Sequence, residues 1–251
     1  MINLEMRQGP IFSRNMAGNW RSLESILRPF DTRIHPLPIQ VPSNLVRASV
    51  LVPLFWKNGE WRVMLTIRAS SLRTHSGVVA FPGGKQDDTD EHEIAAALRE
   101  SNEEVGLNPE DVRVLAVLPP SFASENILVT PVASVIPNDF VPKVNEDEVR
   151  KVFDLPLSRF LTEDYTMTRH EHHGGNVCLY YFTDNIDGET VKTWGYTATI
   201  AMRVAMVILD SDVSRELKDG FYITKENSLS SLSQSNTLKR LARMQDNPAK
   251  L

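Results

Sequence analysis

Three glutamates close together on one predicted helix are the residues of this sequence best suited to chemistry. Glu100, Glu103 and Glu104 fall within the stretch 91–107, which reads EHEIAAALRESNEEVGL. At about 100° per residue, helical side chains three and four positions apart project to one side. Like charges placed in this way repel unless a cation is bound, and Mg²⁺ and Mn²⁺ prefer carboxylate oxygens as ligands. The cluster therefore predicts a site for a divalent metal and a phosphate-bearing substrate.

A solvated charged face is the alternative for any acidic helix, but the residues around this one favour a site. Arg99 stands four residues before Glu103, a spacing that allows an ion pair with that carboxylate. Gly106 follows as a helix stop that favours a positive φ. Upstream, Pro82-Gly83-Gly84 allows the backbone to turn tightly and approach a metal.

Apolar periodicity indicates how the helix packs. One stripe is expected to face the domain, with the carboxylates on the opposite side of the helix. The stripe consists of Ile94, Ala97, Leu98, Ser101 and Val105.

Strand patterns surround the helix. Segments 45–55 and 61–68 are rich in apolar residues and flank Asn58-Gly59, which predicts a hairpin. A short helical or turn segment is expected over 146–153 and 157–161, and a buried helix from near Thr197. Further strands are expected at 112–117, 128–136, 165–170 and 177–183. This alternation predicts an α/β or α+β domain.

Composition divides the chain into three parts. Residues 1–44 are irregular and contain prolines, with one amphipathic helix expected at 20–27, and we interpret them as an N-terminal extension. Residues 45–222 are expected to form the main domain. Residues 223–251 are Ser-rich and then basic, which is typical of a linker and a tail.

Bulk properties exclude several classes of protein. The net charge of −5 disfavours a broad nucleic-acid-binding surface. The most apolar stretch, 197–209, contains Arg203 and is shorter than the ~20 residues that a membrane-spanning helix needs. The single Cys178 is expected to be a small buried hydrophobe in a reducing compartment. We therefore expect a small-molecule substrate, no nucleic-acid partner and no membrane span.

The spacing of the acidic residues resembles the Nudix box, Gly-x5-Glu-x7-Arg-Glu-U-x-Glu-Glu-x-Gly-U, in which U is apolar. Ser101 replaces one apolar residue, and the loop after Gly84 is one residue longer than the pattern. The longer loop leaves open whether Asp90 or Glu91 takes the first acidic position. The resemblance implies the Nudix fold, a mixed β-sheet sandwiched between helices, and metal-dependent cleavage of a diphosphate. The matching residues are Glu91, Arg99, Glu100, Glu103, Glu104, Gly106 and Leu107.

The preceding loop is similar to the motif of the coenzyme A pyrophosphatase branch of the Nudix family, which shares the longer loop. Weaker similarity to peroxisomal eukaryotic members continues at 148–157 and 194–198. The resemblance implies hydrolysis of coenzyme A, or of its acyl or oxidised forms, to 3′,5′-ADP and 4′-phosphopantetheine or its acylated form. The motif comprises Met64-Leu65-Thr66-x-Arg68-Ala69, Arg73, Gly77 and Phe81-Pro82-Gly83-Gly84.

The resemblance and the chemistry together assign expected roles to the carboxylates. Glu100 and Glu104 are expected to ligate Mg²⁺ or Mn²⁺, with Glu103 as a further ligand. Glu103 and Glu148 are both candidates for the general base. Glu148 has an equally reasonable structural interpretation as an N-terminal helix residue favoured by the helix dipole.

Substrate contacts are expected from the loop before the box. Arg68 and Arg73 offer fork-shaped donors to phosphate oxygens, with surface salt bridges as the alternative. His75 is a third candidate, for which a solvent-facing loop position is an equal alternative. Trp194 and Tyr196 either stack on adenine or pack beside the neighbouring helix.

Other functions and a location follow from the same residues. A Nudix hydrolase for ADP-ribose or NADH is one alternative, and a non-catalytic nucleotide-binding module is another, although such modules typically lose box carboxylates. Ala249-Lys250-Leu251 is a close variant of the Ser-Lys-Leu peroxisomal address. It predicts a peroxisomal import receptor as a partner and a peroxisomal location, with cytoplasm and mitochondrion as alternatives.

Overall fold

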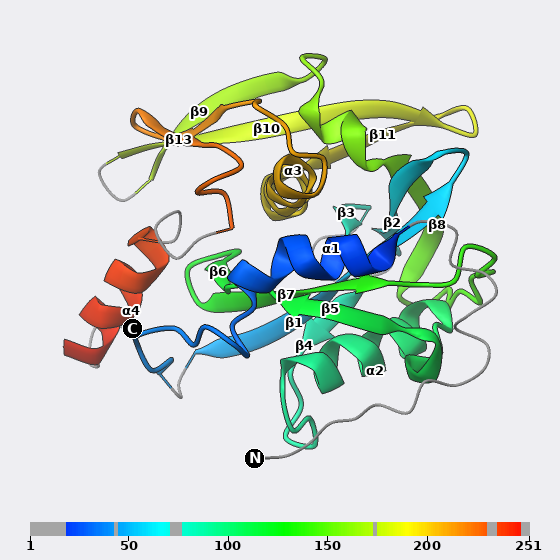
Figure 1. Ribbon diagram of the computed structural model, residues 1–251, viewed down its shortest axis with the longest axis horizontal. Coiled ribbons are helices and arrows are strands. Elements are labelled where there is room, and N and C mark those ends of the chain that lie inside the picture. The colour runs from blue at the N-terminus through cyan, green and yellow to red at the C-terminus, as the bar shows by residue number, and fades with distance from the viewer. Residues whose placement is uncertain (1–18, 43–44, 71–76, 173–174, 230–234, 247–251) are drawn as a thin grey trace.

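A computed structural model describes residues 19–42, 45–70, 77–172, 175–229 and 235–246. The described elements form successive layers (Figure 1). Helix α2 (Glu93–Val105) covers one face of an eight-stranded sheet, and helix α3 (Gly195–Ile208) lies between this sheet and a second, five-stranded sheet. No described helix is both long and apolar enough to cross a membrane.

Strand β1 (Val46–Lys57) is the centre of the larger sheet. It pairs antiparallel with β2 (Glu60–Arg68) through the predicted hairpin, in which Asn58 and Gly59 have φ of 55° and 82°. On its other side β1 runs parallel to β7 (Ile127–Val135), so the sheet is mixed, as expected.

The remaining strands of this sheet extend its two edges. On one side β3 (Val79–Ala80) and β8 (Val149–Pro156) pair with β2, and β4 (Gly83–Lys85) pairs with β1. On the other side β5 (Arg113–Val117) and β6 (Ser121–Phe122) pair with β7.

The two faces of β1 bury different side chains, because alternate residues of a strand point in opposite directions. Val52 and Leu54 belong to a core shared with α3, whereas Leu51 and Phe55 belong to a core shared with α2. This arrangement confirms the expected sheet sandwiched between helices.

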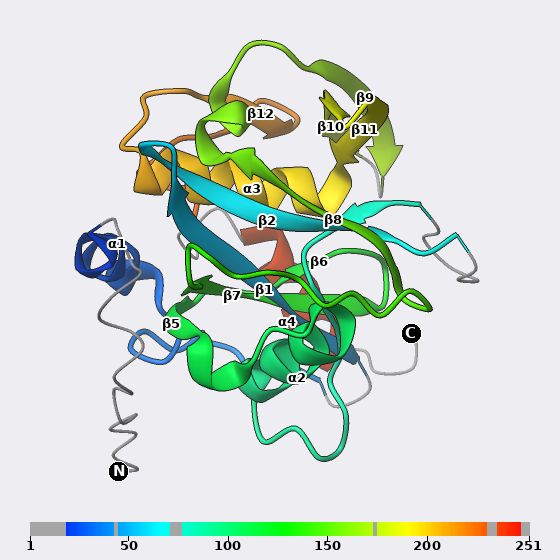
Figure 2. The same cartoon turned by 90° about the vertical axis from the view of Figure 1, so that its right-hand side faces the viewer.

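The second sheet covers α3 on the side away from β1 (Figure 2). Cys178 is buried on its longest strand, as expected. Thr197 begins the run of buried residues in α3, which confirms the expected core helix. The strands of this sheet are β9 (Thr166–His172), β10 (Gly175–Ile186), β11 (Glu189–Trp194), β12 (Arg215–Lys218) and β13 (Phe221–Ile223).

The expected helical or turn segment over 146–153 is wrong for most of its length, because Val149 begins strand β8. Val149, Phe153 and Leu155 are buried at even spacings, which is the period of a strand. Pairing with β2 determines the conformation. The following segment 157–161 is a 3-10 helix, Leu157–Leu161.

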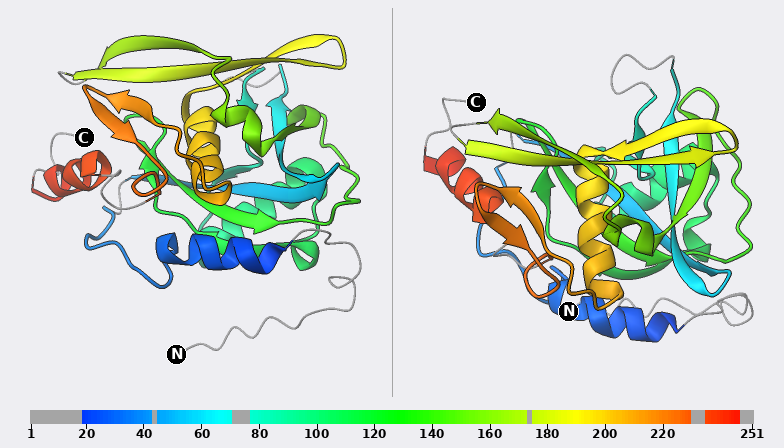
Figure 3. Two further views of the ribbon diagram at one scale, coloured as in Figure 1. Left: turned by 45° about the horizontal axis from the view of Figure 1, so that its top comes forward. Right: turned by 90° about the horizontal axis from the view of Figure 1, so that it is seen from above.

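Helices lie near both ends of the described chain. Helix α1 (Trp20–Leu27) has the predicted bounds and buries Leu23 and Leu27 in the core with α3. Helix α4 (Ser235–Asp246) lies within the segment expected to be a linker and tail, at one edge of the molecule (Figure 3). Its Leu241 is buried with Leu45 and Leu128. The division of the chain into an extension, a domain and a tail is still a prediction.

Replacing Leu241 with Ala is expected to weaken the docking of α4. The change removes a buried side chain, at a cost of about 2 to 4 kcal/mol, and the α4 amides should exchange with deuterium faster. The exposed Arg243 on the same helix provides the control, since Arg243→Ala should leave that exchange rate unchanged. Equal exchange in Leu241→Ala and wild type would show that the buried contact does not hold the helix.

Candidate functional site

Helix α2 is capped at both ends, and its end at Gly106 is the one that the sequence predicts. Its first turn is capped by His92, whose Nδ1 accepts a hydrogen bond of 3.1 Å from the Ala95 N–H. It ends at Gly106, where φ is 69° and the N–H donates to the Asn102 carbonyl at 2.9 Å. The helix that carries the glutamates is therefore held at both of its ends.

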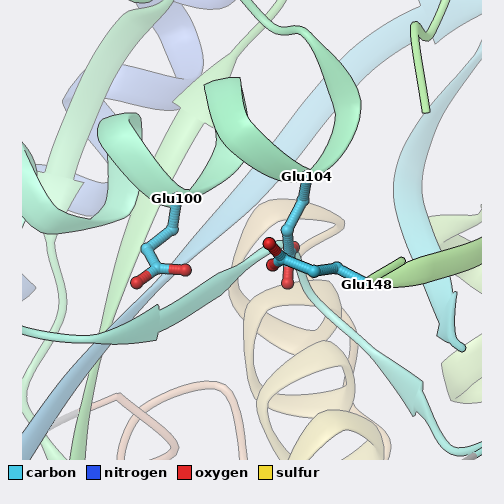
Figure 4. A group of neighbouring side chains, drawn as sticks. All are labelled: Glu100, Glu104 and Glu148. Carbon is cyan, nitrogen blue, oxygen red and sulfur yellow. The ribbon is translucent and has the colours of Figure 1, made fainter. Parts of the chain in front are cut away.

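Three carboxylates from two separate segments converge beside this helix (Figure 4). Glu100 and Glu104 of α2 and Glu148 from the loop before β8 place carboxylate oxygens within 4.8 Å of one another. The Asn145 side chain donates a hydrogen bond of 3.2 Å to Glu148 Oε1, which orients that residue. No other group of three or more His, Cys, Asp or Glu side chains with this proximity occurs in the described part of the chain.

The glycine-rich strand β4 closes over the cluster. The Gly83 N–H donates a hydrogen bond of 3.1 Å to Glu104 Oε2. A Cβ atom on Gly84 would lie 2.4 Å from Oε2 of Glu100, so a side chain at this position would displace that carboxylate. The backbone of β4 therefore holds the Glu104 carboxylate and lies against that of Glu100.

Burial makes the cluster costly without a cation. Glu104 is 2% exposed, and its burial raises its pKa to about 7, although the Gly83 N–H and Arg68 oppose the change. Burial also raises the pKa of Glu100, while Arg99 opposes this effect. An all-oxygen donor set with this repulsion fits a Mg²⁺-like or Mn²⁺-like ion.

Arg99 connects the cluster to the preceding loop. Its Nη2 lies 2.9 Å from Asp90 Oδ2, and its Nη1 lies 3.1 Å from Glu100 Oε1 and 3.1 Å from Glu103 Oε2. Glu91 is exposed. Asp90, and not Glu91, is therefore the loop acid that contacts the box arginine, which the longer loop had left open.

The structure separates the three helix glutamates that the spacing placed together. The side chain of Glu103 is 49% exposed and pairs with Arg99, outside the cluster of Glu100 and Glu104. Adjacent helical residues differ by about 100° in direction, so Glu103 diverges from Glu104. The expectation that the carboxylates lie opposite the apolar stripe is wrong for Glu104, which is buried beside Ser101 and Val105.

Glu148 is the third member of the cluster. It lies outside α2, so the spacing of residues along that helix could not predict its place. From the sequence, Glu148 is expected only as a candidate base. A long segment separates it from α2. The pairing of β8 with β2 brings it back, and the Asn145 N–H adds a hydrogen bond of 2.9 Å to the Glu104 carbonyl at the end of α2. The acidic run 146–148 was the sole local sign of its importance.

The residues expected to bind substrate lie in different surroundings or outside the described residues. Arg68 lies at the end of β2 with Nη1 3.5 Å from Glu104 Oε1, so it borders the cluster. Arg73 and His75 lie outside the described residues. Tyr196 packs internally and donates a hydrogen bond of 3.1 Å to the Val129 carbonyl, while Trp194 is 38% exposed.

The raised pKa of Glu104 predicts an unusual pH dependence of metal-free stability. The pKa of this carboxyl rises from an ordinary 4.5 to about 7 on folding, so folding favours its protonated form. Its contribution to stability is complete below the ordinary pKa and is lost as the pH rises through the folded pKa. Metal-free protein should therefore lose stability between about pH 4.5 and pH 7, with a slope of at most about 1.4 kcal/mol per pH unit from this group.

The measurement is urea unfolding at several pH values with a chelator present. Glu104→Gln is the matched variant, because an amide oxygen still accepts the Gly83 hydrogen bond but does not titrate. The slope should be smaller in the variant. A wild-type stability that follows the same pH profile as the variant would contradict the raised pKa.

Comparisons with known proteins identify the family. A NUDIX domain model matches residues 45–164. The chain is 38% identical over 196 residues to the Nudix hydrolase NudL of Klebsiella pneumoniae, covering 77% of this chain and 98% of the relative.

Two eukaryotic proteins are similarly related. Identity is 38% over 165 residues to the peroxisomal coenzyme A diphosphatase NUDT7 of Mus musculus, covering 64% of this chain and 70% of the relative. It is 39% over 165 residues to the mitochondrial Nudix hydrolase 15 of Arabidopsis thaliana, covering 64% of this chain and 58% of that protein. Together with the box residues around the carboxylate cluster, these matches show that the chain belongs to the Nudix hydrolase family.

Proposed function

We propose that this Nudix hydrolase cleaves the diphosphate of coenzyme A and its derivatives, giving 3′,5′-ADP and 4′-phosphopantetheine or its acylated form. The observation that carries the proposal of hydrolysis is the convergence of Glu100, Glu104 and Glu148 within 4.8 Å. Nudix hydrolases generally use divalent metals. Mg²⁺ and Mn²⁺ are the ions we propose, because carboxylates are their preferred protein ligands.

The proposed roles follow the geometry of the carboxylates. Glu100, Glu104 and Glu148 are the proposed metal ligands. A divalent ion would neutralise charge on the diphosphate and lower the pKa of the attacking water. Glu103 is the proposed general base, because its side chain is half-exposed and shares Arg99 with Glu100. Its alternative role is that of a ligand to a further metal ion.

Two observations support coenzyme A as the substrate, namely the similarity to the mouse relative and the position of Arg68. The mouse relative is named a coenzyme A diphosphatase. Arg68 is partly exposed beside Glu104, and we propose that its guanidinium binds phosphate oxygens, together with Arg73 and with His75 as a further candidate. ADP-ribose and NADH are the alternative substrates.

A peroxisomal location is a further proposal, supported by the name of the mouse relative, whereas the plant relative is named mitochondrial. Ala249, Lys250 and Leu251, the proposed contacts of an import receptor, lie outside the described residues. A fluorescent protein fused ahead of residue 1 should enter peroxisomes, and removal of these three residues should leave it in the cytosol. Unchanged peroxisomal import after removal would refute their role.

Incubation with coenzyme A and Mg²⁺ or Mn²⁺ should yield 3′,5′-ADP and 4′-phosphopantetheine, resolved by chromatography and mass spectrometry. ADP-ribose and NADH, tested at the same concentration, should be cleaved with a lower kcat/KM. A preference for either of them would overturn coenzyme A as the substrate but leave metal-dependent hydrolysis intact.

Glu104→Gln and Glu148→Gln should each lower kcat/KM for coenzyme A by at least about 100-fold, because each removes a charged ligand. Glu146→Gln is the matched control, since Glu146 is an exposed acid in the same loop as Glu148. Glu103→Gln tests the proposed role of Glu103 as the general base. Near-normal turnover in that variant would exclude Glu103 as the base and as an essential ligand.

A further inference from the structure

An aromatic pair on the second sheet consists of a half-buried tyrosine and an exposed tryptophan. Tyr181 of β10 and Trp194 of β11 are direct cross-strand neighbours, with ring centroids 5.8 Å apart and planes inclined by 17°. Cross-strand aromatic pairs stabilise hairpins, but Trp194 is still 38% exposed. A large stacking surface of this kind is available to a planar ligand.

A lysine stands on the same face of this sheet. Lys192 is two residues from Trp194, so both side chains leave β11 in the same direction. Its Nζ lies 5.8 Å from the centroid of the Tyr181 ring. In the part of the chain that the structure describes, no carboxylate forms a salt bridge with Lys192. An exposed indole and an ammonium without a carboxylate partner, on one face of the sheet, match the two parts of a phosphorylated nucleoside, a flat base and an anion.

Two hydrogen bonds link the start of α3, next to Trp194, to the end of β2 where Arg68 lies. Trp194 immediately precedes α3, where Thr197 Oγ1 donates to the Val79 carbonyl of β3 at 3.1 Å. Next to Val79, the Val78 carbonyl accepts a hydrogen bond of 3.1 Å from the Arg68 N–H. Figure 2 accordingly shows β11 above the ends of β2 and β8.

The proposed substrate also has an adenosine 3′-phosphate portion, which the carboxylate cluster would not bind. A divalent ion there would attract the diphosphate, whereas the adenine and the ribose 3′-phosphate of coenzyme A extend away from the bond that is cleaved. Stacking on an aromatic ring is a usual way to bind a base, and a lysine near the ring suits a second phosphate.

We propose that Trp194 stacks on the adenine of the substrate and that Lys192 contacts the ribose 3′-phosphate. The inference rests on the proposed function and deepens it, because it assigns the group that distinguishes coenzyme A from dephospho-coenzyme A. Trp194 is a binding residue in this account, while the carboxylates act on the diphosphate. Tyr181 supports the indole from its other side.

Steady-state kinetics with coenzyme A and dephospho-coenzyme A test both contacts. Trp194→Ala should raise KM for both substrates about tenfold with little change in kcat, and Trp194→Phe should restore most of the affinity. Lys192→Gln should raise KM about fivefold for coenzyme A only, because dephospho-coenzyme A lacks the 3′-phosphate. Trp56→Ala is the matched control, because Trp56 belongs to another aromatic pair, with Trp61, in the β1–β2 hairpin.

The outcomes separate this inference from the proposed function. An unchanged KM in Trp194→Ala, or an equal increase in Trp56→Ala, overturns the stacking contact even if coenzyme A is cleaved. An equal effect of Lys192→Gln on both substrates overturns the phosphate contact. If the wild type cleaves neither substrate, the proposed function fails, and calorimetry with 3′,5′-ADP tests the inference alone. Binding that Trp194→Ala weakens supports the inference, whereas no binding to the wild type overturns it.

Discussion

Repulsion among buried carboxylates is the constraint on which the site depends. Glu104 is almost inaccessible to water and has Glu100 and Glu148 as neighbours. The Gly83 N–H and the guanidinium of Arg68 offset only part of the charge, so burial still raises the pKa of Glu104 to about 7. A divalent cation between the carboxylates would remove the remaining repulsion. The cluster is thus an energetic cost in the metal-free fold and an advantage when metal is bound.

The layered architecture supplies this arrangement from several directions. The helix face that packs on β1 positions Glu100 and Glu104, and β4 places the backbone of Gly84 directly against the Glu100 carboxylate. Pairing of β8 with β2 brings Glu148 to the same place and positions Arg68 at the strand end. Every contribution comes from a different segment, so local unfolding of any of them would disperse the cluster.

Local sequence signals predicted the local features of this fold. The hairpin at Asn58-Gly59, the end of α2 at Gly106 and the buried stripe of α2 follow from turn chemistry and periodicity. The strand β8, the docking of α4 and the place of Glu148 depend on partners distant in the sequence, which no local pattern encodes. Box spacing identified the acidic helix but did not show that Glu103 would pair with Arg99, outside the group of Glu100, Glu104 and Glu148.

Titration of metal-free protein with Mn²⁺, followed by calorimetry in two buffers of different ionisation enthalpy near pH 7, tests most directly whether the cluster holds a cation. Saturable binding accompanied by proton release is predicted, because the ion would displace the proton that Glu104 retains near this pH. Glu104→Gln should bind more weakly and release fewer protons. Absence of saturable binding to the wild type, or equal affinity and proton release in the variant, would contradict the account.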